Sequence, residues 1–493
     1  LLAFVIMISA MSCNTEELFI EPVEEEVINL EDEEEVVDED TYPGVDASLP
    51  CDFDLNAIDP NATIIINCLM DLGGNTINVP EGVTFLYEGG DIINGTFNFS
   101  DNTIISGELL NSTLILGGST PQLKDPTFEL IPSRWGIVEG VVSDDIALNN
   151  TNVLEQIFFD TKSFGVITFN INSLDAFFKV DGPAAQGITS VRAINIPSDF
   201  NLSMTDNTHL RMQPNGHFRA HLLCILKEKN IKISGGHLHG EREMHNYDSG
   251  YVDSDGSTGV THEWLNTMAI VGGQNIVIDG VTFEDAAGDG LFISDATHYF
   301  RPDNIRSKNI QIKNNKFYRA RRTNLVLVGC EQVIIENNDF IDGGIDMPNS
   351  KGAAPSSDFN SEPVRTWDNG ELIEWERVND VIMRNNFQTL TNAAANPSAG
   401  GFYFSHGNGP IIFENNEVNS NVSFTTIDGL IIRNNIINSG ITAGSADNTY
   451  RTDFVYGNVV SGNKIKKGMI VAGNGITVSD NEIEGETCLY LGP

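Results

Sequence analysis

Basic residues are scarce in this 493-residue sequence, which has 28 Lys and Arg against 69 Asp and Glu and a formal net charge of −41. A nucleic-acid-binding surface needs a basic stripe, so this balance argues against nucleic acid as a partner. The six cysteines include no CxxC pair and no Cys/His cluster, which argues against zinc and against a dense disulfide framework. After the first dozen residues, no stretch is apolar enough to span a membrane.

What the chain has in quantity is Asn, Gly, Ile, Thr and Val, a composition that favours strands and tight turns. Hydrophobic residues make up 40% of the chain, enough to bury a core, so a wholly disordered chain is excluded. Two cysteines, Cys51 and Cys68, are close enough in sequence to pair. Cys224 and Cys330 lie in apolar strand contexts, and we expect both in the core.

The N-terminus has the character of a targeting segment. Residues 1–12 (LLAFVIMISAMS) form an apolar run that is too short to cross a bilayer but fits the remnant of a signal peptide. The ending Ala-Met-Ser-Cys resembles a bacterial lipoprotein signal, which implies that Cys13 is lipidated after cleavage. The alternative is an ordinary signal peptide with a chance cysteine.

An acidic segment follows, with 14 Asp and Glu between Glu16 and Asp40 and no Lys or Arg. Such a block repels itself and stays extended, so we expect a linker at 13–47. It resembles the surface-export signal of Bacteroidetes lipoproteins. The resemblance implies a location on the extracellular side of the outer membrane, where a lipid anchor holds the chain. We also expect a monomer.

A short phrase returns many times from residue 230 onward. It reads NIKISGGHL at 230, NIVIDGVTF at 275, NIQIKNNKF at 309, QVIIENNDF at 332 and GLIIRNNII at 429. Alternating Ile and Val predict short strands with one face in a core, and Asn tolerates the left-handed turn between them. One turn cannot bury its apolar face alone, so the turns are expected to stack and to place Asn over Asn in hydrogen-bonded ladders.

This pattern resembles the right-handed parallel β-helix of the pectate-lyase-like (pectin lyase fold) superfamily. We therefore predict an all-β solenoid with loop insertions and an N-terminal cap. Upstream, residues 79–107 resemble the opening turns of Bacteroidetes β-helix proteins, and a capping helix is expected at Ala147–Phe158. The predicted boundaries are 48–125 for N-terminal β-rich turns and 126–493 for the β-helix.

The stretch from Gly236 to Asn324 concentrates His, carboxylate, Arg and aromatic residues. The repeats align Leu238, Phe283, Phe317 and Phe340 in one column. Two residues later this alignment places Asp285 beside Arg319, which predicts a charge pair. Six residues after the column it places Asp289, Thr323 and Asp346 in successive turns, with the two carboxylates about 10 Å apart, just beyond the spacing of an inverting glycosidase pair.

Asp289 lies in Gly288-Asp289-Gly290, directly before the strand LFIS. Polygalacturonase-like enzymes carry a groove Asp at a similar place, but their Asn-Thr-Asp-Gly, Asp-Asp and Gly-His-Gly signatures are absent here. A plain Gly-Asp-Gly turn is the alternative. The chain also resembles a broader group of glycan-related β-helix proteins, and the positions matching that pattern are Glu241, Arg242, Glu263, Trp264, Asp289, Arg322 and Asn324.

Three functions remain open for a polysaccharide partner. A glycosidase needs two carboxylates, such as Asp289 with Glu263, Asp285 or Glu241. A lyase or epimerase acting on uronic-acid glycans needs a base and a group that neutralises the substrate, for which Arg319, Arg322 and His262 are candidates. A non-catalytic glycan-binding or adhesin lipoprotein needs neither. The candidate substrate-binding residues are His239, Trp264, Tyr318, Asn324 and Trp367.

Two loops interrupt the coil. The loop from Glu241 to Trp264 contains DSDGSTG at 253–259, whose alternating oxygens suit Ca²⁺ but lack the terminal Glu of an EF-hand; a solvated loop is the alternative. The insertion from Gly343 to Glu376 carries carboxylates and two tryptophans. We expect it to border the substrate, because loops on rigid scaffolds carry function.

Overall fold

The computed structural model describes residues 51, 54–180, 193–250, 262–345, 347, 357–368, 371–391, 401–443 and 457–490. The signal segment, Cys13, the acidic linker, the calcium candidate at 253–259 and Asp346 lie outside these residues. None of the helices in the described part combines the length and the hydropathy that a membrane span requires.

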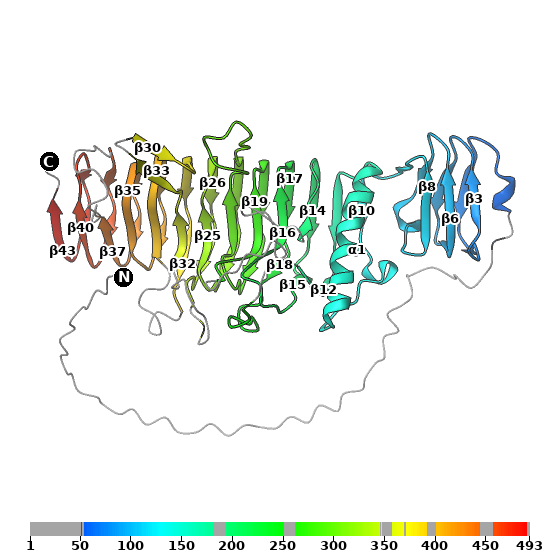
Figure 1. The fold of residues 1–493 in the computed structure, drawn as a ribbon, viewed down its shortest axis with the longest axis horizontal. Helices are drawn as coiled ribbons and strands as arrows, with labels where there is room; N and C mark the ends of the chain where they lie inside the picture. Colours follow the sequence, from blue (N-terminus) through cyan, green and yellow to red (C-terminus); the bar gives the residue numbers. More distant parts are fainter. Residues whose placement is uncertain are drawn as a thin grey trace, which may run out of the picture. The chain divides into compact units, whose positions relative to one another are not determined.

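The first nine strands form three small parallel sheets, ordered β1-β4-β7-β9, β2-β5 and β3-β6-β8 (Figure 1). The first two turns each give one strand to each sheet, and later turns continue the stacking, so this segment is already a coil. Cys51 and Cys68, which are close enough in sequence to pair, form a disulfide. The strands are β1 (Thr63–Ile66), β2 (Leu69–Asp71), β3 (Thr76–Val79), β4 (Thr84–Tyr87), β5 (Asp91–Ile93), β6 (Gly95–Phe99), β7 (Ile104–Ile105), β8 (Leu114–Gly118) and β9 (Gln122–Leu123).

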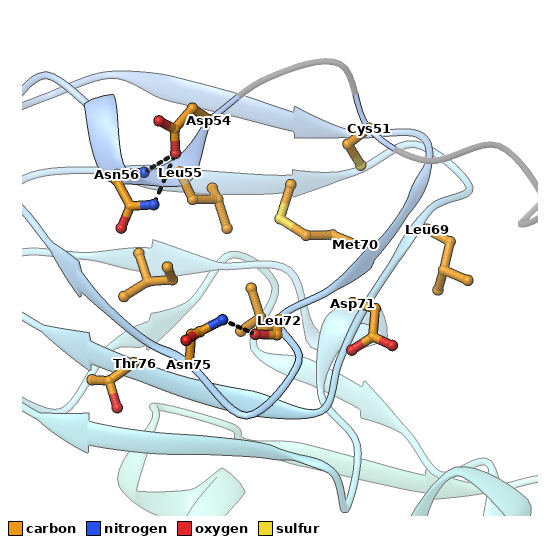
Figure 2. A pocket seen from close by; sticks show the side chains of 11 residues that line it. Cys51, Asp54, Leu55, Asn56, Leu69, Met70, Asp71, Leu72, Asn75 and Thr76 are labelled. Carbon is orange, nitrogen blue, oxygen red and sulfur yellow. Dashed lines mark hydrogen bonds between the residues drawn. The ribbon is translucent and has the colours of Figure 1, made fainter.

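A cavity of about 640 Å³ lies at the first turn, beneath the 3-10 helix η1 (Leu55–Ala57). Figure 2 shows the apolar side chains of Leu55, Met70 and Leu72 around it. Its two carboxylates already serve local turns, because Asp54 accepts from Asn56 and Asp71 accepts from the Gly73 amide at 2.9 Å. We interpret this cavity as a packing gap at the first turn.

The helix α1 (Asp144–Ser163) confirms the expected capping helix and is longer than predicted at both ends. Two carboxylates, Asp144 and Asp145, lie in its first turn, where their negative charge interacts favourably with the positive end of the helix dipole. Its inner face buries Phe158, whose ring lies 4.8 Å from that of Phe169 and 5.5 Å from that of Phe200. The shorter 3-10 helices are η2 (Gly107–Leu109) and η3 (Pro132–Trp135).

From β10 (Thr127–Glu129) onward the strands join one 21-stranded and one 11-stranded parallel sheet, which confirms a parallel β-helix. Each full turn has three strands, which stack in three columns. The first column, half of the large sheet, contains β11 (Thr168–Ile171), β14 (Phe200–Met204), β17 (Lys229–Ser234), β20 (Gln274–Asp279), β23 (Lys308–Lys313), β26 (Cys330–Glu336), β31 (Val378–Arg384), β38 (Val459–Ser461) and β41 (Thr477–Ser479).

The second column is the 11-stranded sheet. It contains β12 (Leu174–Phe178), β15 (Thr208–Met212), β18 (His237–His239), β21 (Thr282–Glu284), β24 (Lys316–Tyr318), β27 (Asp339–Ile341), β32 (Phe387–Thr389), β34 (Glu417–Val418), β36 (Ile436–Ile437), β39 (Lys464–Ile465) and β42 (Glu482–Ile483).

The third column completes the large sheet. It contains β13 (Ile194–Asn195), β16 (Arg219–Leu226), β19 (Trp264–Val271), β22 (Leu291–Ser294), β25 (Thr323–Leu327), β28 (Ser357–Ser361), β37 (Gly440–Ala443), β40 (Gly468–Ala472) and β43 (Glu486–Tyr490). Two long strands, β33 (Gly401–Glu414) and β35 (Val422–Arg433), pair with strands of both columns. A hairpin of β29 (Arg365–Asp368) and β30 (Glu371–Glu374) projects between turns.

At the corner between the first and second columns, the two residues of each Asn-Asn pair have different roles. The first Asn takes a left-handed backbone, as Asn314 does at φ 57°. The second Asn is buried, and its amide groups donate to the side-chain oxygen of the next turn's Asn. The resulting ladder confirms the expected stacking; it runs through Asn315, Asn338, Asn386, Asn416, Asn435, Asn463 and Asn481.

The core register also follows the repeat. Leu238 pairs with Phe283, which pairs with Phe317, which pairs with Phe340, so the predicted column is confirmed. The rings of Phe283 and Phe317 stack at 4.8 Å. Cys224 and Cys330 are buried free thiols, as expected.

The predicted register beyond Phe340 is wrong. Thr323 pairs with Ser357, so Ser357 occupies the place expected for Asp346. The connecting segment between β27 and β28 is longer than in the preceding turn and shifts the register. The stacking expected between Asp289 and Asp346 therefore does not follow from the register, and Asp358, next to Ser357, accepts a hydrogen bond from Asn324.

Candidate functional site

Charged side chains gather at the corner between the second and third columns. The segments 240–263, 285–290 and 319–322 connect these columns in successive turns. Because the flanking strands pair in parallel, side chains of successive connections lie above one another. Insertions of different length enter here, so the corner varies from turn to turn.

Arg322 is the centre of this corner. Its Nη1 atom lies 3.3 Å from Asp289 Oδ2 and 3.6 Å from Glu263 Oε2, and its Nη2 atom lies 2.9 Å from Glu362 Oε1. Glu362 also accepts a hydrogen bond of 2.6 Å from Asn360. Three turns thus deliver three carboxylates to one guanidinium, which holds them together despite their mutual repulsion.

The tight approach of neighbouring turns explains the two glycines around Asp289. A Cβ at Gly288 would lie 2.3 Å from the Glu263 carbonyl oxygen, and one at Gly290 would lie 2.4 Å from the Asn324 carbonyl oxygen. Both positions therefore need glycine for space. The Gly-Asp-Gly sequence has a structural reason whatever the role of its carboxylate.

A cavity of about 410 Å³ opens beside Arg322. Trp264, whose residue surface is 38% exposed, and Phe292 give it an aromatic side, and Glu263, Glu362 and Glu376 give it acidic groups. An exposed aromatic face beside carboxylates offers both stacking and hydrogen bonding to a sugar ring. The other lining residues are Arg322, Val328, Pro363, Val364 and Ser405.

Two acids at this site have strongly raised pKa values. Burial raises the pKa of Asp289 to about 7, in spite of the opposing charge of Arg322. Burial also raises the pKa of Glu376 to about 7, and the nearby Glu362 carboxylate adds to the effect. Asp289 is fully buried and does not line the cavity, whereas Glu376 does. Glu376 is therefore placed to hold a proton at neutral pH at the cavity wall.

A second charged cluster lies on the same corner. Asp285 pairs with Arg242 at 3.0 Å and with Arg319 at 3.4 Å, so the predicted Asp285–Arg319 pair is confirmed. Glu243 bonds Arg319 at 2.7 Å, and the Arg319 guanidinium lies over the Tyr318 ring. None of these five residues lines the cavity beside Arg322.

A third group is buried in the described parts of the connection between β18 and β19. His245 Nδ1 lies 2.9 Å from Glu241 Oε1, and its Nε2 lies 2.8 Å from His262 Nδ1. Burial raises the pKa of Glu241 well above its usual range, and burial lowers the pKa of His262 to about 4. Arg321 donates to the His262 carbonyl at 2.7 Å. This buried chain ties these parts of the connection to the coil.

The other predicted binding residues lie in separate places. His239 contacts Glu284 on the outer face of the second column. Asn324 donates to the buried Asp358 at 2.5 Å. Trp367 belongs to β29, and its side chain lies outside the described residues. The structure brings together Asp289, Glu263, Trp264 and Arg322 and leaves the remaining candidates elsewhere.

Glu362 and Glu376 were not singled out as catalytic candidates from the sequence. Both belong to the insertion expected to border the substrate, and the sequence signal for them was the carboxylates and two tryptophans that this insertion carries. They reach the site because the hairpin β29–β30 folds back. The Trp375 and Glu376 amides donate to the Val364 carbonyl, and the Val364 amide donates to Glu376 at 2.8 Å.

No family model matches the chain. It is similar to the uncharacterized protein YclG of Bacillus subtilis (strain 168), with 28% identity over 302 residues, which is 59% of this chain and 48% of YclG. It is also similar to the SPbeta prophage-derived uncharacterized protein YorA of the same strain, with 26% identity over 305 residues and the same shares. The chain spans about half the length of the curated relatives it matches.

Solved structures show distant likenesses. PfbA, a surface adhesin of Streptococcus pneumoniae, has 12% identity and a TM-score of 0.38 over 71% of this chain and 89% of PfbA. The A-module of the mannuronan C-5 epimerase AlgE6 of Azotobacter vinelandii has 12% identity and a TM-score of 0.39 over 72% of this chain and 93% of the module. The fold assignment rests on the chain's own stacked parallel strands.

Proposed function

We propose that the chain is a glycoside hydrolase that cleaves an extracellular polysaccharide at the cavity beside Arg322. The observation that carries this proposal is the arrangement of carboxylates there. Glu376 has a pKa of about 7 and lines the same cavity as Glu263, which is paired with Arg322. Two carboxyl groups, one protonated and one held as a carboxylate, are what glycoside hydrolysis requires.

In the proposed reaction Glu376 donates its proton to the glycosidic oxygen as the bond to the anomeric carbon breaks. Glu263 accepts a proton from the attacking water, or attacks the anomeric carbon itself before water releases the sugar. The net change is the addition of one water across the glycosidic bond. Trp264 supplies a face on which a sugar ring stacks.

Asp289 then acts beneath the cavity as a positioning residue. Its Oδ2 and Glu263 Oε2 both contact Arg322 Nη1, so these oxygens are separated by no more than the sum of the two distances, 6.9 Å. Asp289 has no exposed surface, so it does not contact the substrate. We assign it the task of orienting Arg322, and through Arg322 the carboxylate of Glu263.

A lyase or epimerase is less well supported by the geometry. It needs a cation for the substrate carboxylate and a base within reach. Arg322 already contacts three carboxylates, Arg319 contacts two, and His262 is buried. These three groups are committed to partners within the chain.

The proposed location is the extracellular side of the outer membrane, with a lipid on Cys13 and the acidic linker as spacer. The sequence of residues 1–40 supports it. Labelling with a radioactive fatty acid should mark the chain, and Cys13→Ser should remove the label. Label retained in the variant would refute the anchor.

The function is tested by a screen of pectins, alginate, carrageenans, agars and neutral glycans. New reducing ends report hydrolysis, and absorbance at 235 nm reports β-elimination. We expect reducing ends without absorbance on at least one glycan. Glu376→Gln should lower that rate by about 10²–10⁴-fold, the usual contribution of a general acid.

Glu374→Gln is the matched control, because Glu374 lies two residues away in β30 and does not line the cavity. It should keep full activity. Growth of absorbance at 235 nm, or equal activity of the two variants, would overturn the assignment. Binding to a glycan without any cleavage would favour an adhesin instead.

A further inference from the structure

Three histidines meet on the outer face of the second column, away from the residues of the cavity beside Arg322. His209 lies in β15, and His237 and His239 lie in the next strand, β18. His209 pairs directly with His237, and their rings stack at 4.5 Å. Each of the three imidazoles offers one ring nitrogen, and these nitrogens lie within 4.8 Å of one another.

We propose that these three histidines bind one divalent transition-metal ion, with Zn²⁺ as the best match. Neutral imidazole nitrogens suit Zn²⁺, whereas Ca²⁺ and Mg²⁺ prefer oxygen ligands. Three protein ligands leave one position of a tetrahedral ion open for water or for an oxygen of a bound molecule. This inference does not rest on the proposed hydrolase.

Glu284, in the following strand β21, fixes how two of the rings point. Its Oε1 lies 3.1 Å from His237 Nδ1, and its Oε2 lies 3.1 Å from His239 Nδ1. An ionised carboxylate only accepts hydrogen bonds, so both Nδ1 atoms carry the hydrogen. Both Nε2 atoms therefore keep a lone pair for a ligand, as in the carboxylate–histidine pairs that support zinc sites.

His209 completes the set from the opposite side. Its Nδ1 lies 2.9 Å from His239 Nε2, so the two nitrogens point at one another. Two nitrogens bound to one tetrahedral Zn²⁺ at about 2.1 Å are about 3.4 Å apart. An ion thus requires the two rings to separate by roughly half an ångström, a shift within side-chain freedom.

The scaffold beneath the histidines is rigid, and their outer side is accessible. Leu210, Leu238 and Phe283 alternate with the site residues and are buried, which holds the three strands in register. The side chains of His237 and His239 are 24% and 12% exposed. An ion can therefore enter from solvent without unfolding the coil.

The surrounding charge also allows a cation. Arg211 pairs with His239 in the strand register, and it donates hydrogen bonds of 2.5 and 3.1 Å to Asp175. The carboxylate of Asp175 offsets part of the Arg211 charge. Glu284 adds a negative charge next to two of the ligands.

The test uses the untagged full chain, stripped of metal and titrated with Zn²⁺ in a calorimeter and with Co²⁺ in a spectrophotometer. We expect one ion per chain and visible Co²⁺ absorption typical of a four-coordinate site. His239→Ala should lower the affinity for Zn²⁺ by at least 100-fold. Glu284→Gln should lower it by about 10–100-fold, as loss of an outer-shell carboxylate does.

His298→Ala is the control, because His298 lies in another loop beside Trp375 and is absent from the three-histidine group. It should bind Zn²⁺ like the original chain, and circular dichroism should show that every variant keeps its strands. Absence of one-to-one binding in the original chain would overturn the proposal. So would equal affinity of the His239→Ala and His298→Ala chains.

Discussion

Two corners of the same coil differ in what they repeat. The corner between the first and second columns carries an Asn-Asn pair in turn after turn, with the second Asn in a continuous ladder. The corner between the second and third columns carries a different segment in every turn. The first of these corners thus repeats the same buried hydrogen bonds, and the second varies and holds the charged side chains.

The hydrogen bonding of buried polar side chains also differs between the two corners. In the ladder, Asn386 donates to Asn416 and to the Ile335 carbonyl and accepts from Asn338. At the variable corner, within the described residues, Asp289 Oδ1 and two guanidinium nitrogens of Arg242 are buried without a hydrogen-bond partner. Buried polar atoms are rarely left unpaired, and Ser361 Oγ and Arg377 Nε are further examples in the described residues.

The largest effect is expected from Arg322→Met, which removes the centre of the variable corner. Asp289 would keep a buried carboxyl group without its cation, and loss of one partner of a buried pair costs about 3–5 kcal/mol. Urea unfolding should show this loss in the free energy of unfolding. Adding Asp289→Asn should restore most of the stability without restoring hydrolysis; if the double variant stays as unstable as the single one, Asp289 is not the partner that matters.

A smaller loss is expected from Asn386→Ala in the ladder. It removes the acceptor of the Asn338 amide groups and the donor to the Ile335 carbonyl, and each unsatisfied buried group costs about 1–3 kcal/mol. Urea unfolding should detect the loss, while the rate of glycan cleavage stays unchanged. Asn98→Ala, on an exposed Asn98–Asn78 contact, should cost less than about 1 kcal/mol. If the two variants lose the same free energy of unfolding, the buried ladder stabilises the fold no more than an exposed Asn contact does.

The third prediction concerns pH. Glu376 must be protonated to donate, and its pKa is about 7. The ratio kcat/KM, which reports the free enzyme, should therefore fall about tenfold per pH unit above pH 7. A pH–rate profile of the original chain measures this limb. A profile that stays level to pH 9 would exclude Glu376 as the proton donor.

The repeats made the fold predictable, because each turn carries its own strand and turn signals. The column from Leu238 to Phe340 and the Asp285–Arg319 pair follow from counting residues between identical phrases. Counting residues gave the wrong register after Phe340, where a longer connection places Ser357 at the position expected for Asp346. The insertion that contains Glu376 resembles no other turn of the sequence. Only tertiary packing therefore places Glu376 in the same cavity as Arg322.

The three-histidine group was missed for a related reason. A search for closely spaced Cys and His in one segment finds no zinc pattern, since His209 precedes His237 by a full turn of the coil. Only the strand register sets His209 against His237 and places Glu284 against His239. In a solenoid the spacing that matters is one turn, and the turn length varies.

The smallest effect is expected from Arg319→Ala, which tests whether every charge at the variable corner matters. The Arg319 side chain is 31% exposed, and its partner Glu243 is 62% exposed. Exposed ion pairs contribute about 0–1 kcal/mol, so unfolding should shift little. Because Arg319 does not line the cavity, the cleavage rate should also stay within about twofold, as measured by reducing ends. A large loss of activity with intact stability would move the chemistry from Arg322 to the Asp285 cluster and revive the lyase, for which Arg319 was a candidate base.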